Sequence, residues 1–396
     1  MSHCRAHTFL FCLAWLPLFS TPLACTPTHF DDADAGNTFE ETDDAGEPVP
    51  AQRSFYMGFT PWPYAATVEA MDTTYRGIQE NGDLIAHHLM EGVPWEAALN
   101  GEPLSSQIQS DVEGRLARTD VGKRIYLAAD ALNLERNGLA LSWEESGSVQ
   151  LSTPWDTRRF NDDAVIDAYA AYATALIEQF TPDYFCYASE ASELILNDID
   201  VYNDFIVFAE AVYSRLKTAY PELPFMISVA LKSPGSTEAR AIEAELPRLL
   251  DFVDIVGVSV YPYAFYTHED RGNSDNLPSN WLSQIASFSG GKPTAITETG
   301  WIAEDLTIAA YNFDIESTEV YQAEYVLRLL ESAQSLSMVF VVWFTYADFD
   351  TLWTDTLAQD PLAAIWRDTG LLDGDLEPRA GLVVWQESCA TDYSSP

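Results

Sequence analysis

Eight short apolar runs, separated by stretches with helical periodicity, constrain the fold of this chain more than any other feature of its sequence. The runs are rich in β-branched and aromatic residues and almost continuously apolar, which is typical of parallel strands covered by helices. In chain order, the predicted strands are 54–60, 83–89, 124–129, 184–189, 225–231, 255–261, 294–299 and 339–346. Eight strands in succession are the number that closes a barrel, and 396 residues exceed the ~250 of a typical one. The sequence therefore predicts an α/β protein with a single (β/α)8 barrel, and a doubly wound sheet is the less favoured alternative.

The helices between these strands are clearest in the middle of the chain. Apolar residues recur at three- and four-residue steps over 165–180 and again over 201–220. Ser317 and Thr318 are candidate N-caps of a further helix that runs to about Gln334. Two long segments, 91–123 and 263–281, are predicted to be elaborated loops beside the site.

The N-terminal region is predicted to be an export signal followed by a tether. Arg5 precedes an apolar run over 9–19, which is too short to cross a bilayer at ~20 residues per helix. The run ends at Pro22-Leu-Ala-Cys25, which resembles a bacterial lipobox and predicts lipidation of Cys25, with cleavage near Ala24 as the alternative. Residues 25–52 are acidic and lack apolar periodicity, so we expect a disordered tether. The predicted organisation is a signal peptide over 1–24, the tether over 25–52 and the barrel over 53–396, in a protein exported to the cell surface or periplasm or secreted.

The large net negative charge of the chain argues against nucleic acids and anionic membranes as binding partners. The chain has 61 acidic and 20 basic residues, a formal net charge of −41. Such a protein cannot neutralise the phosphates of nucleic acid or an anionic membrane, so membrane contact is expected only through the lipid anchor. A strongly anionic polysaccharide is also disfavoured unless the cleft is locally basic. No spacing of Cys and His residues resembles a zinc site, and no metal or cofactor is predicted. Cys186 and Cys389 are the two cysteines of the predicted barrel, and a disulfide between them is possible.

Polar and aromatic side chains gather where the predicted strands end, which is where barrels of this kind carry their active sites. The candidate binding residues at these ends are Trp62, His88, Asp130, Tyr261, Trp301, Trp343 and Asp348. Glu190 ends the fourth strand and Glu298 the seventh, so they face each other across the barrel mouth. Two such carboxyl groups can hydrolyse a glycosidic bond, one protonating the leaving oxygen and the other attacking the anomeric carbon.

Three motifs resemble those of the clan A glycoside hydrolases. Ala295-Ile-Thr-Glu-Thr-Gly-Trp301 is similar to the strand-seven motif whose glutamate is the nucleophile, and Gly257-Val-Ser-Val-Tyr-Pro262 to the strand-six segment whose tyrosine binds it. The segment 369–380, with Trp385, resembles the clan's C-terminal ending. The resemblance, which covers about residues 54–388, implies that Glu298 is the nucleophile, that Tyr261 helps to keep it ionised, and that Glu190 is the acid/base.

The fourth strand departs from that pattern. Most clan members have Asn before the acid/base, where its amide binds the sugar 2-hydroxyl, whereas this chain has Ser189. Glu193 is therefore an alternative acid/base. Endo-β-1,4-galactanases are similar in having a compact barrel, but their strand-six and strand-eight details are not reproduced around Tyr261 and Trp343.

The resulting hypothesis is an exported retaining glycoside hydrolase that cleaves β-linked neutral oligo- or polysaccharides. The aromatic residues at the strand ends would stack on sugar faces, and one of the adjacent residues His87 and His88 would point into the barrel because side chains alternate along a strand. The missing Asn before Glu190 supports an alternative hypothesis, a non-catalytic glycan-binding surface lipoprotein on the same scaffold.

Overall fold

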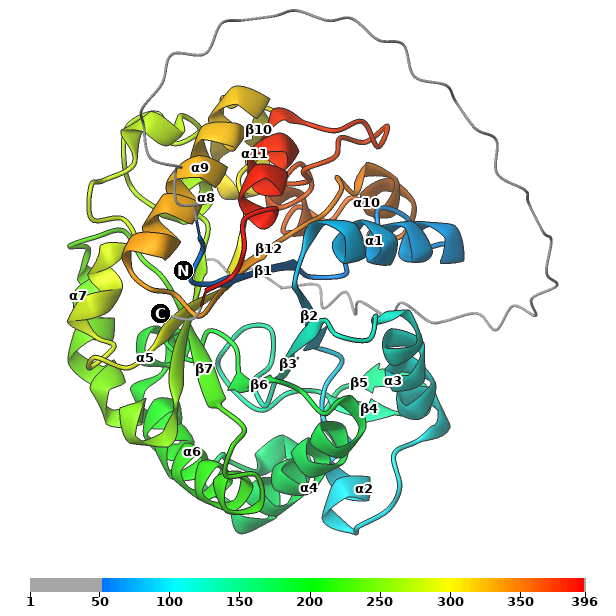
Figure 1. Ribbon diagram of the computed structural model, residues 1–396. Coiled ribbons are helices and arrows are strands. Elements are labelled where there is room, and N and C mark those ends of the chain that lie inside the picture. Colours follow the sequence, from blue (N-terminus) through cyan, green and yellow to red (C-terminus); the bar gives the residue numbers. More distant parts are fainter. Residues whose placement is uncertain (1–51, 395–396) are drawn as a thin grey trace, which may run out of the picture.

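The computed structural model describes residues 52–394, and these form a closed barrel of eight parallel strands with helices around it (Figure 1). Around the barrel the strands follow chain order, β1-β2-β3-β6-β7-β8-β9-β12, and β12 pairs with β1 to close it. The barrel strands are β1 (Tyr56–Phe59), β2 (Leu84–Leu89), β3 (Arg124–Ala129), β6 (Tyr184–Ala188), β7 (Phe225–Ala230), β8 (Ile255–Val260), β9 (Thr294–Thr299) and β12 (Phe340–Trp343). The predicted (β/α)8 barrel is confirmed, and closure excludes the doubly wound alternative. The predicted signal segment, Cys25 and all but the last residue of the predicted tether lie outside the described residues.

Helices follow most of the strands and pack their apolar faces against the outside of the barrel. Their bounds are α1 (Val68–Asn81), α2 (Trp95–Leu99), α3 (Ser106–Arg118), α4 (Asp163–Phe180), α5 (Glu193–Asn197), α6 (Ile199–Ala219), α7 (Thr237–Glu245), α8 (Pro262–Phe265), α9 (Glu319–Ser335), α10 (Asp350–Asp355) and α11 (Ala380–Cys389). Thr318 caps α9 by accepting a hydrogen bond from the backbone N–H of Tyr321. Ser317, the other candidate cap, donates instead to the carbonyl oxygens of Gly272 and Ile302.

Two features of the connections differ from prediction. The segment 91–123 is not an elaborated loop, because it contains α2 and α3, and Ile108 and Val112 bury one face of α3 at a four-residue spacing. The segment 263–281 is largely irregular, as predicted, apart from the end of α8 and a short 3-10 turn at Ser274–Asn276. Two hairpins were not predicted. They are formed by β4 (Ser142–Glu144) with β5 (Gly147–Val149) and by β10 (Leu306–Ile308) with β11 (Phe313–Ile315).

Side-chain alternation along β2 explains which histidine faces the site. Leu84 and Ala86 belong to the apolar cluster inside the barrel, whereas Ile85 packs outward against the helices. His88 continues the inward series and lines the cavity at the barrel mouth. His87 is fully buried on the outer side, with its Nε2 2.9 Å from Thr119 Oγ1. His88 is therefore the inward residue of the pair.

A β-bulge interrupts the alternation in β9. Val258 pairs with Ile296 and Ser259 with Glu298, so Thr297 is an extra residue in the ladder. Ile296 packs outward, and Thr297 and Glu298 both line the cavity. Thr299 then returns to the outer side, where its hydroxyl lies 2.6 Å from the Tyr325 hydroxyl on α9. Without the bulge, strict alternation would turn Glu298 outward.

The two ends of the described chain meet at the end of the barrel where the strands begin. The backbone N–H of Arg53 donates to the Asp392 carbonyl at 3.1 Å, and the rings of Tyr56 and Tyr393 stack. Cys186 and Cys389 are both free thiols, so the disulfide that could have joined them is not formed. Over residues 52–394, no helix is both long enough and apolar enough to span a bilayer.

Candidate active site

A cavity of about 710 Å³ opens at the ends of the strands, and both Glu190 and Glu298 line it. It reaches from Trp62, after β1, past His88 on β2 to Trp366 near the end of the chain. The cavity thus lies where the strand-end residues were predicted to meet.

Glu298 has an uncharged neighbour beside each of its two carboxyl oxygens. The Tyr261 hydroxyl donates to Oε1 at 2.7 Å, and His88 Nδ1 lies 3.6 Å from Oε2. Burial first, and then the charge of nearby Glu190, raise the pKa of Glu298 to about 7, although the Tyr261 hydrogen bond and the Arg136 charge act in the opposite direction. Tyr261 thus favours the ionised form of Glu298, as expected, but burial outweighs this hydrogen bond, and the carboxyl group is only partly ionised at neutral pH.

His88 is uncharged at neutral pH. Burial first, and then the charges of Arg115 and Arg136, lower the pKa of His88 to about 4. Its contact with Glu298 is thus one between an imidazole and a carboxyl group, and His88 brings no positive charge to the site.

Glu190 sits directly after β6 in a left-handed backbone conformation, with φ of 54°. Its N–H donates to Ser228 Oγ at 2.8 Å, which fixes the backbone. The Ser259 hydroxyl donates to Glu190 Oε1 at 2.9 Å, and Arg136 Nε lies 3.5 Å from Oε2. The carboxyl group therefore has one neutral and one cationic neighbour.

Glu193, the alternative acid/base, lies elsewhere. It begins α5 and pairs with Lys232, whose Nζ is 2.6 Å from its Oε1. Its side chain is not among those that line the cavity. The geometry favours Glu190 over Glu193 for a role at the cavity.

Asp130 was predicted to bind substrate, but it acts behind the cavity wall. Its side chain is buried, and Oδ1 accepts a hydrogen bond from the backbone N–H of Ser189 at 2.5 Å. Oδ2 lies 3.7 Å from Arg136 Nη2. Asp130 thus positions both Arg136 and the residue that precedes Glu190, and it does not line the cavity.

The predicted aromatic residues separate into two groups. Trp62 lines the cavity, as expected of a sugar platform, and its ring lies 5.6 Å from that of Phe344. Trp301 and Trp343 are fully buried, with their indole N–H groups bonded to the Gly272 and Thr369 carbonyls, respectively. The expectation that these two rings stack on sugars is corrected, because both belong to the core.

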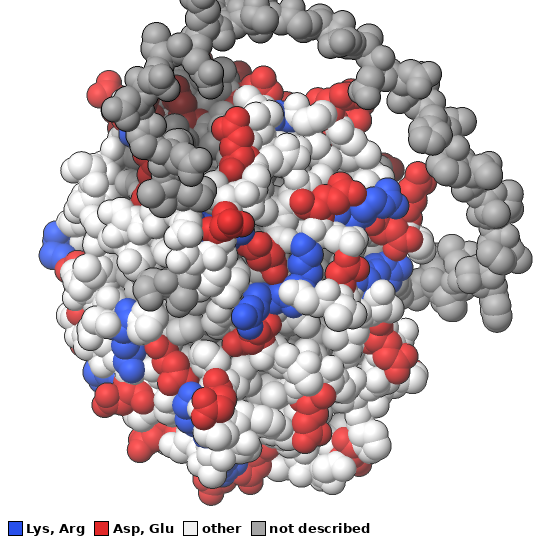
Figure 2. Space-filling model, in the orientation of Figure 1, with Lys and Arg blue, Asp and Glu red and all other residues white. Residues whose placement is uncertain are grey.

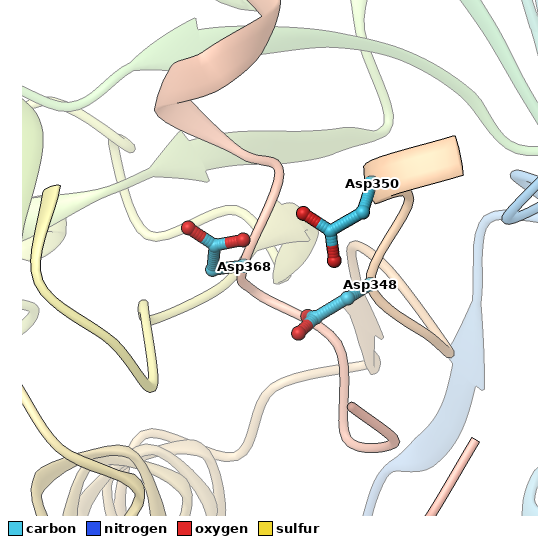
Figure 3. Close-up of side chains that lie close together, drawn as sticks. All are labelled: Asp348, Asp350 and Asp368. Carbon is cyan, nitrogen blue, oxygen red and sulfur yellow. The ribbon is translucent and has the colours of Figure 1, made fainter. Parts of the chain in front are cut away.

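Asp348 was also predicted to bind substrate, and this is corrected too. It is almost fully buried, pairs with Arg379 at 2.7 Å and accepts a hydrogen bond from the Gly370 N–H. Burial raises the pKa of Asp348, and the Arg379 guanidinium at 2.7 Å opposes this by favouring the ionised carboxylate. Its carboxylate points toward those of Asp350 and Asp368, and the three offer oxygens within 4.8 Å of one another (Figure 3).

These three carboxylates have a spacing that suits a metal ion, but they already have cationic partners. Arg367 pairs with Asp350 at 3.2 Å and with Asp368 at 2.7 Å, while Arg379 pairs with Asp348. We therefore interpret this acidic cluster as an ion-pair network that joins the chain after β12 to the C-terminal segment.

Basic side chains in the cavity are also paired. Arg115 bonds to Asp111 at 2.8 Å and to Glu91 at 3.3 Å, and Arg136 lies between Asp130 and Glu190. Arg158 stacks over Trp155, with Asp162 at 3.8 Å. On the molecular face drawn in Figure 2, acidic side chains are spread widely, and most basic ones lie beside them. Neither the cavity nor this face offers an unbalanced positive patch.

Sequence reasoning missed three cavity residues that bear on the chemistry. Ser259 precedes Tyr261 by two positions, so the alternation that places Tyr261 inward also predicts Ser259 on the same face. Arg136 lies in a connection and reaches Glu190 only through the tertiary fold, so no local pattern indicates it. Trp366 lies 5.7 Å from Tyr261, ring to ring, and its indole N–H has no hydrogen-bond partner among the described residues.

Comparison with known proteins supports the fold. Neither a family model nor a curated protein matches the sequence. Among solved structures, the chain is similar to an exo-β-1,4-mannosidase from Opitutaceae bacterium strain TAV5, with 15% identity, a TM-score of 0.57, and coverage of 85% of this chain and 59% of that one. It is also similar to a β-D-glucuronidase from Dictyoglomus thermophilum, with 15% identity, a TM-score of 0.52, and coverage of 87% and 52%. A β-glucuronidase from Bifidobacterium dentium gives 14% identity, a TM-score of 0.52, and coverage of 87% and 48%.

This chain therefore spans about half to three fifths of the length of these proteins. At such low identity the similarity establishes a shared barrel fold. This shared fold agrees with the predicted resemblance to clan A, and the similarity to endo-β-1,4-galactanases stays a prediction.

Proposed function

We propose that this protein is a retaining β-glycoside hydrolase in which Glu298 is the nucleophile and Glu190 the acid/base. The observation that carries the proposal is that the two carboxyl groups share one cavity, and each is oriented by its own hydroxyl donor. Tyr261 orients Glu298, and Ser259 orients Glu190. Ser259, which donates to Glu190, is also the β8 residue that pairs with Glu298 on β9, so the two carboxyl groups lie close together.

In the first step, ionised Glu298 attacks the anomeric carbon while protonated Glu190 gives its proton to the departing glycosidic oxygen. The product of this step is a glycosyl ester on Glu298 and a released alcohol. In the second step, Glu190 takes a proton from water, and the oxygen of that water displaces Glu298 from the sugar. Retention requires the two carboxyl groups to stand ~5–5.5 Å apart.

The first step requires a proton on Glu190 and none on Glu298. Burial is the largest cause of the raised pKa of Glu298, about 7, so this carboxyl group is only partly ionised at neutral pH. Arg136 Nε lies 3.5 Å from Glu190 Oε2 and places a positive charge beside the proposed acid/base in both steps.

The substrate class that we propose is an uncharged β-linked sugar. The similar structures are described as two β-glucuronidases and an exo-β-1,4-mannosidase. In this chain the cavity arginines Arg115, Arg136 and Arg158 each have carboxylate neighbours, and the net charge is −41. This arrangement supports a neutral sugar over a uronic acid, and it supports no role for nucleic acid.

We also propose that the protein is exported and anchored through a lipid on Cys25. The sequence from Arg5 to Cys25 is the support for this proposal. Expression of the full chain in a bacterial host, followed by mass spectrometry of the mature N-terminus, tests it. A diacylglyceryl group on Cys25 is expected, and an unmodified N-terminus after Ala24 would replace the anchor with simple secretion.

The test of the activity compares purified residues 52–396 with three variants, Glu298→Gln, Glu190→Gln and Glu193→Gln. The substrates are 4-methylumbelliferyl β-glycosides of the common neutral sugars and of glucuronic acid, together with β-glucans, mannans, galactans and xylans read by reducing-sugar release. We expect turnover by the wild type and by Glu193→Gln, and a loss of at least about 100-fold in both other variants. A 2-deoxy-2-fluoro glycoside of the preferred sugar should then label the peptide that contains Glu298.

A second candidate function is non-catalytic glycan binding. The observations that favour it are Ser189 in place of the expected Asn and the cation beside Glu190. It predicts affinity for one of the same glycans, measured by calorimetry, with no release of product by any variant.

A further inference from the structure

The surroundings of Glu190 differ in chemistry from those of Glu298, and this difference bears on what leaves the sugar. Near Glu298 the cavity has an aromatic wall, which we define as Trp62, Phe344, Phe349 and Trp366. Trp366 packs edge-on against Tyr261, the residue bonded to Glu298. Flat rings of this kind suit the faces of a sugar, so the aromatic wall fits the glycone.

The rest of the cavity contains an aliphatic wall. We define it as Met90, Leu132, Leu134, Leu139, Leu141 and Leu151. Most of it belongs to the connection that follows β3, and Arg136 in the same connection contacts Glu190. These aliphatic side chains share this part of the cavity with Trp155 and with polar residues such as Gln150 and Arg158.

The connection is held in place from three sides. Leu132 and Leu139 form a β-bridge that closes it on itself, and the Leu141 carbonyl accepts a hydrogen bond from Val93 at 2.9 Å. Asn197, on the helix just after Glu190, donates to the Arg136 carbonyl at 3.1 Å. The aliphatic wall is therefore a built surface with a fixed position beside Glu190.

Two members of this wall remain open to solvent at the mouth of the cavity. Met90 is 39% exposed and Leu134 is 51% exposed. A polar side chain in the same stretch, Asn133, exchanges hydrogen bonds with Asn137 within the loop. Exposed aliphatic groups that adjoin a reactive centre indicate a surface that is covered by a ligand when the site is in use.

We propose that the leaving group of the substrate is apolar, so that this protein acts on β-glycosides of an alkyl or aryl alcohol more efficiently than on oligosaccharides. The proposal rests on the proposed function, because the acid that protonates the glycosidic oxygen must lie on the side of the leaving group. Glu190 has the aliphatic wall on that side. A second sugar packed against the aliphatic wall would place hydroxyl groups next to side chains that cannot hydrogen-bond them, which carries a desolvation cost.

The experiment has a binding arm and a turnover arm. For binding, methyl, hexyl and octyl β-glucosides and β-galactosides are titrated below their micelle concentrations into the Glu298→Gln variant of residues 52–396, and the heat is measured. For turnover, kcat/KM is measured with the wild type on the same series and on the disaccharide of the same sugar. We expect up to about fourfold per added methylene until the wall is covered, which corresponds to ~0.8 kcal/mol per buried methylene.

Three variants identify the surface responsible. Met90→Gln and Leu134→Asn should flatten the dependence on chain length, because each removes exposed apolar area from the wall. Leu327→Asn is the matched control, since Leu327 is 49% exposed on α9 and does not line the cavity. It should leave the chain-length dependence as in the wild type.

The outcomes separate the two proposals. If kcat/KM does not depend on chain length, or is at least tenfold higher for the disaccharide, the apolar leaving group is overturned, whereas the proposed glycosidase activity is supported. Chain-length-dependent binding without turnover supports the apolar subsite and counts against catalysis. Equal affinity for methyl and octyl glycosides overturns the subsite whatever the turnover.

Discussion

Replacing Glu298 by Gln should stabilise the fold at alkaline pH while it abolishes activity. The folded-state pKa of Glu298 is about 7, against an ordinary value of 4.5, with burial as the largest cause. A carboxyl group with a raised pKa contributes stability below its unfolded value, and this contribution is lost as pH rises through the folded value. Above pH 7 the wild type therefore holds a buried negative charge that the glutamine variant lacks.

The size of the effect follows from the shift. A difference of 2.5 units between 4.5 and about 7 corresponds to roughly 3 kcal/mol at pH 8.5, at ~1.36 kcal/mol per unit. A quarter of the side chain remains exposed, and solvent screening reduces the figure, so we expect about 2 kcal/mol. At pH 5 the expected gain falls below about 1 kcal/mol, because folded Glu298 is then protonated.

Urea denaturation of residues 52–396 at pH 5 and pH 8.5, followed by tryptophan fluorescence, measures both values. Glu331→Gln is the matched control, since Glu331 is exposed on α9, and it should leave the unfolding free energy within about 0.5 kcal/mol of the wild type at both pH values. A Glu298→Gln variant that is no more stable than the wild type at pH 8.5 would refute the argument that burial strains this carboxylate. A gain of equal size at both pH values would point to packing instead of charge.

Three further predictions concern the same region. Tyr261→Phe removes a hydrogen bond that lowers the pKa of Glu298, so the acidic limb of kcat/KM should move upward by up to about one unit, and activity at pH 6 should fall more than at pH 8.5. Glu193→Gln should keep more than half of wild-type turnover with the pH profile unchanged, because its partner is Lys232; a loss of 100-fold would transfer the acid/base role to it. Asp348→Ala should cost ~3 kcal/mol in urea denaturation, because it removes the buried carboxyl partner of Arg379 and leaves only the exposed Glu304 beside it. Asp350→Ala should cost under ~1 kcal/mol, and equal costs would contradict the ion-pair interpretation.

Much of the fold could be predicted from the sequence because strand and helix periodicity are local. All eight strands were found, since each is a continuous apolar run, and the helix after the third strand was found from its repeat of Val165 to Phe180. The segment 91–123 was wrongly predicted to be a loop because α3 is mostly polar and only a few of its residues, among them Ile108 and Val112, are apolar and buried. Its burial depends on the barrel behind it, which no local pattern records.

Placement at the site was predictable where it followed from alternation along a strand. His88 and Tyr261 face the cavity region for that reason. Trp301 and Trp343 were misplaced because a strand-end position does not say whether the side chain turns to the cavity or to the helices. Asp348 was misplaced because its partner, Arg379, is 31 residues away along the chain. Arg136 could not be found at all, since its contact with Glu190 exists only once the connection after β3 has folded against α5.

The extra residue in β9 also determines how deep in the cavity the Glu298 carboxyl group lies. In a regular strand, every second side chain points into the barrel, so inward side chains can lie only at positions two residues apart along the strand. Because the bulge places Thr297 and Glu298 on the same face of β9, the Glu298 side chain lies between the two positions that regular alternation would allow. Deleting Thr297 would keep a glutamate facing inward but lower it by about one residue, ~3.3 Å, which is as long as the ~3–3.5 Å between reacting atoms before attack. For the proposed mechanism, the length of this strand therefore matters as much as the identity of its glutamate.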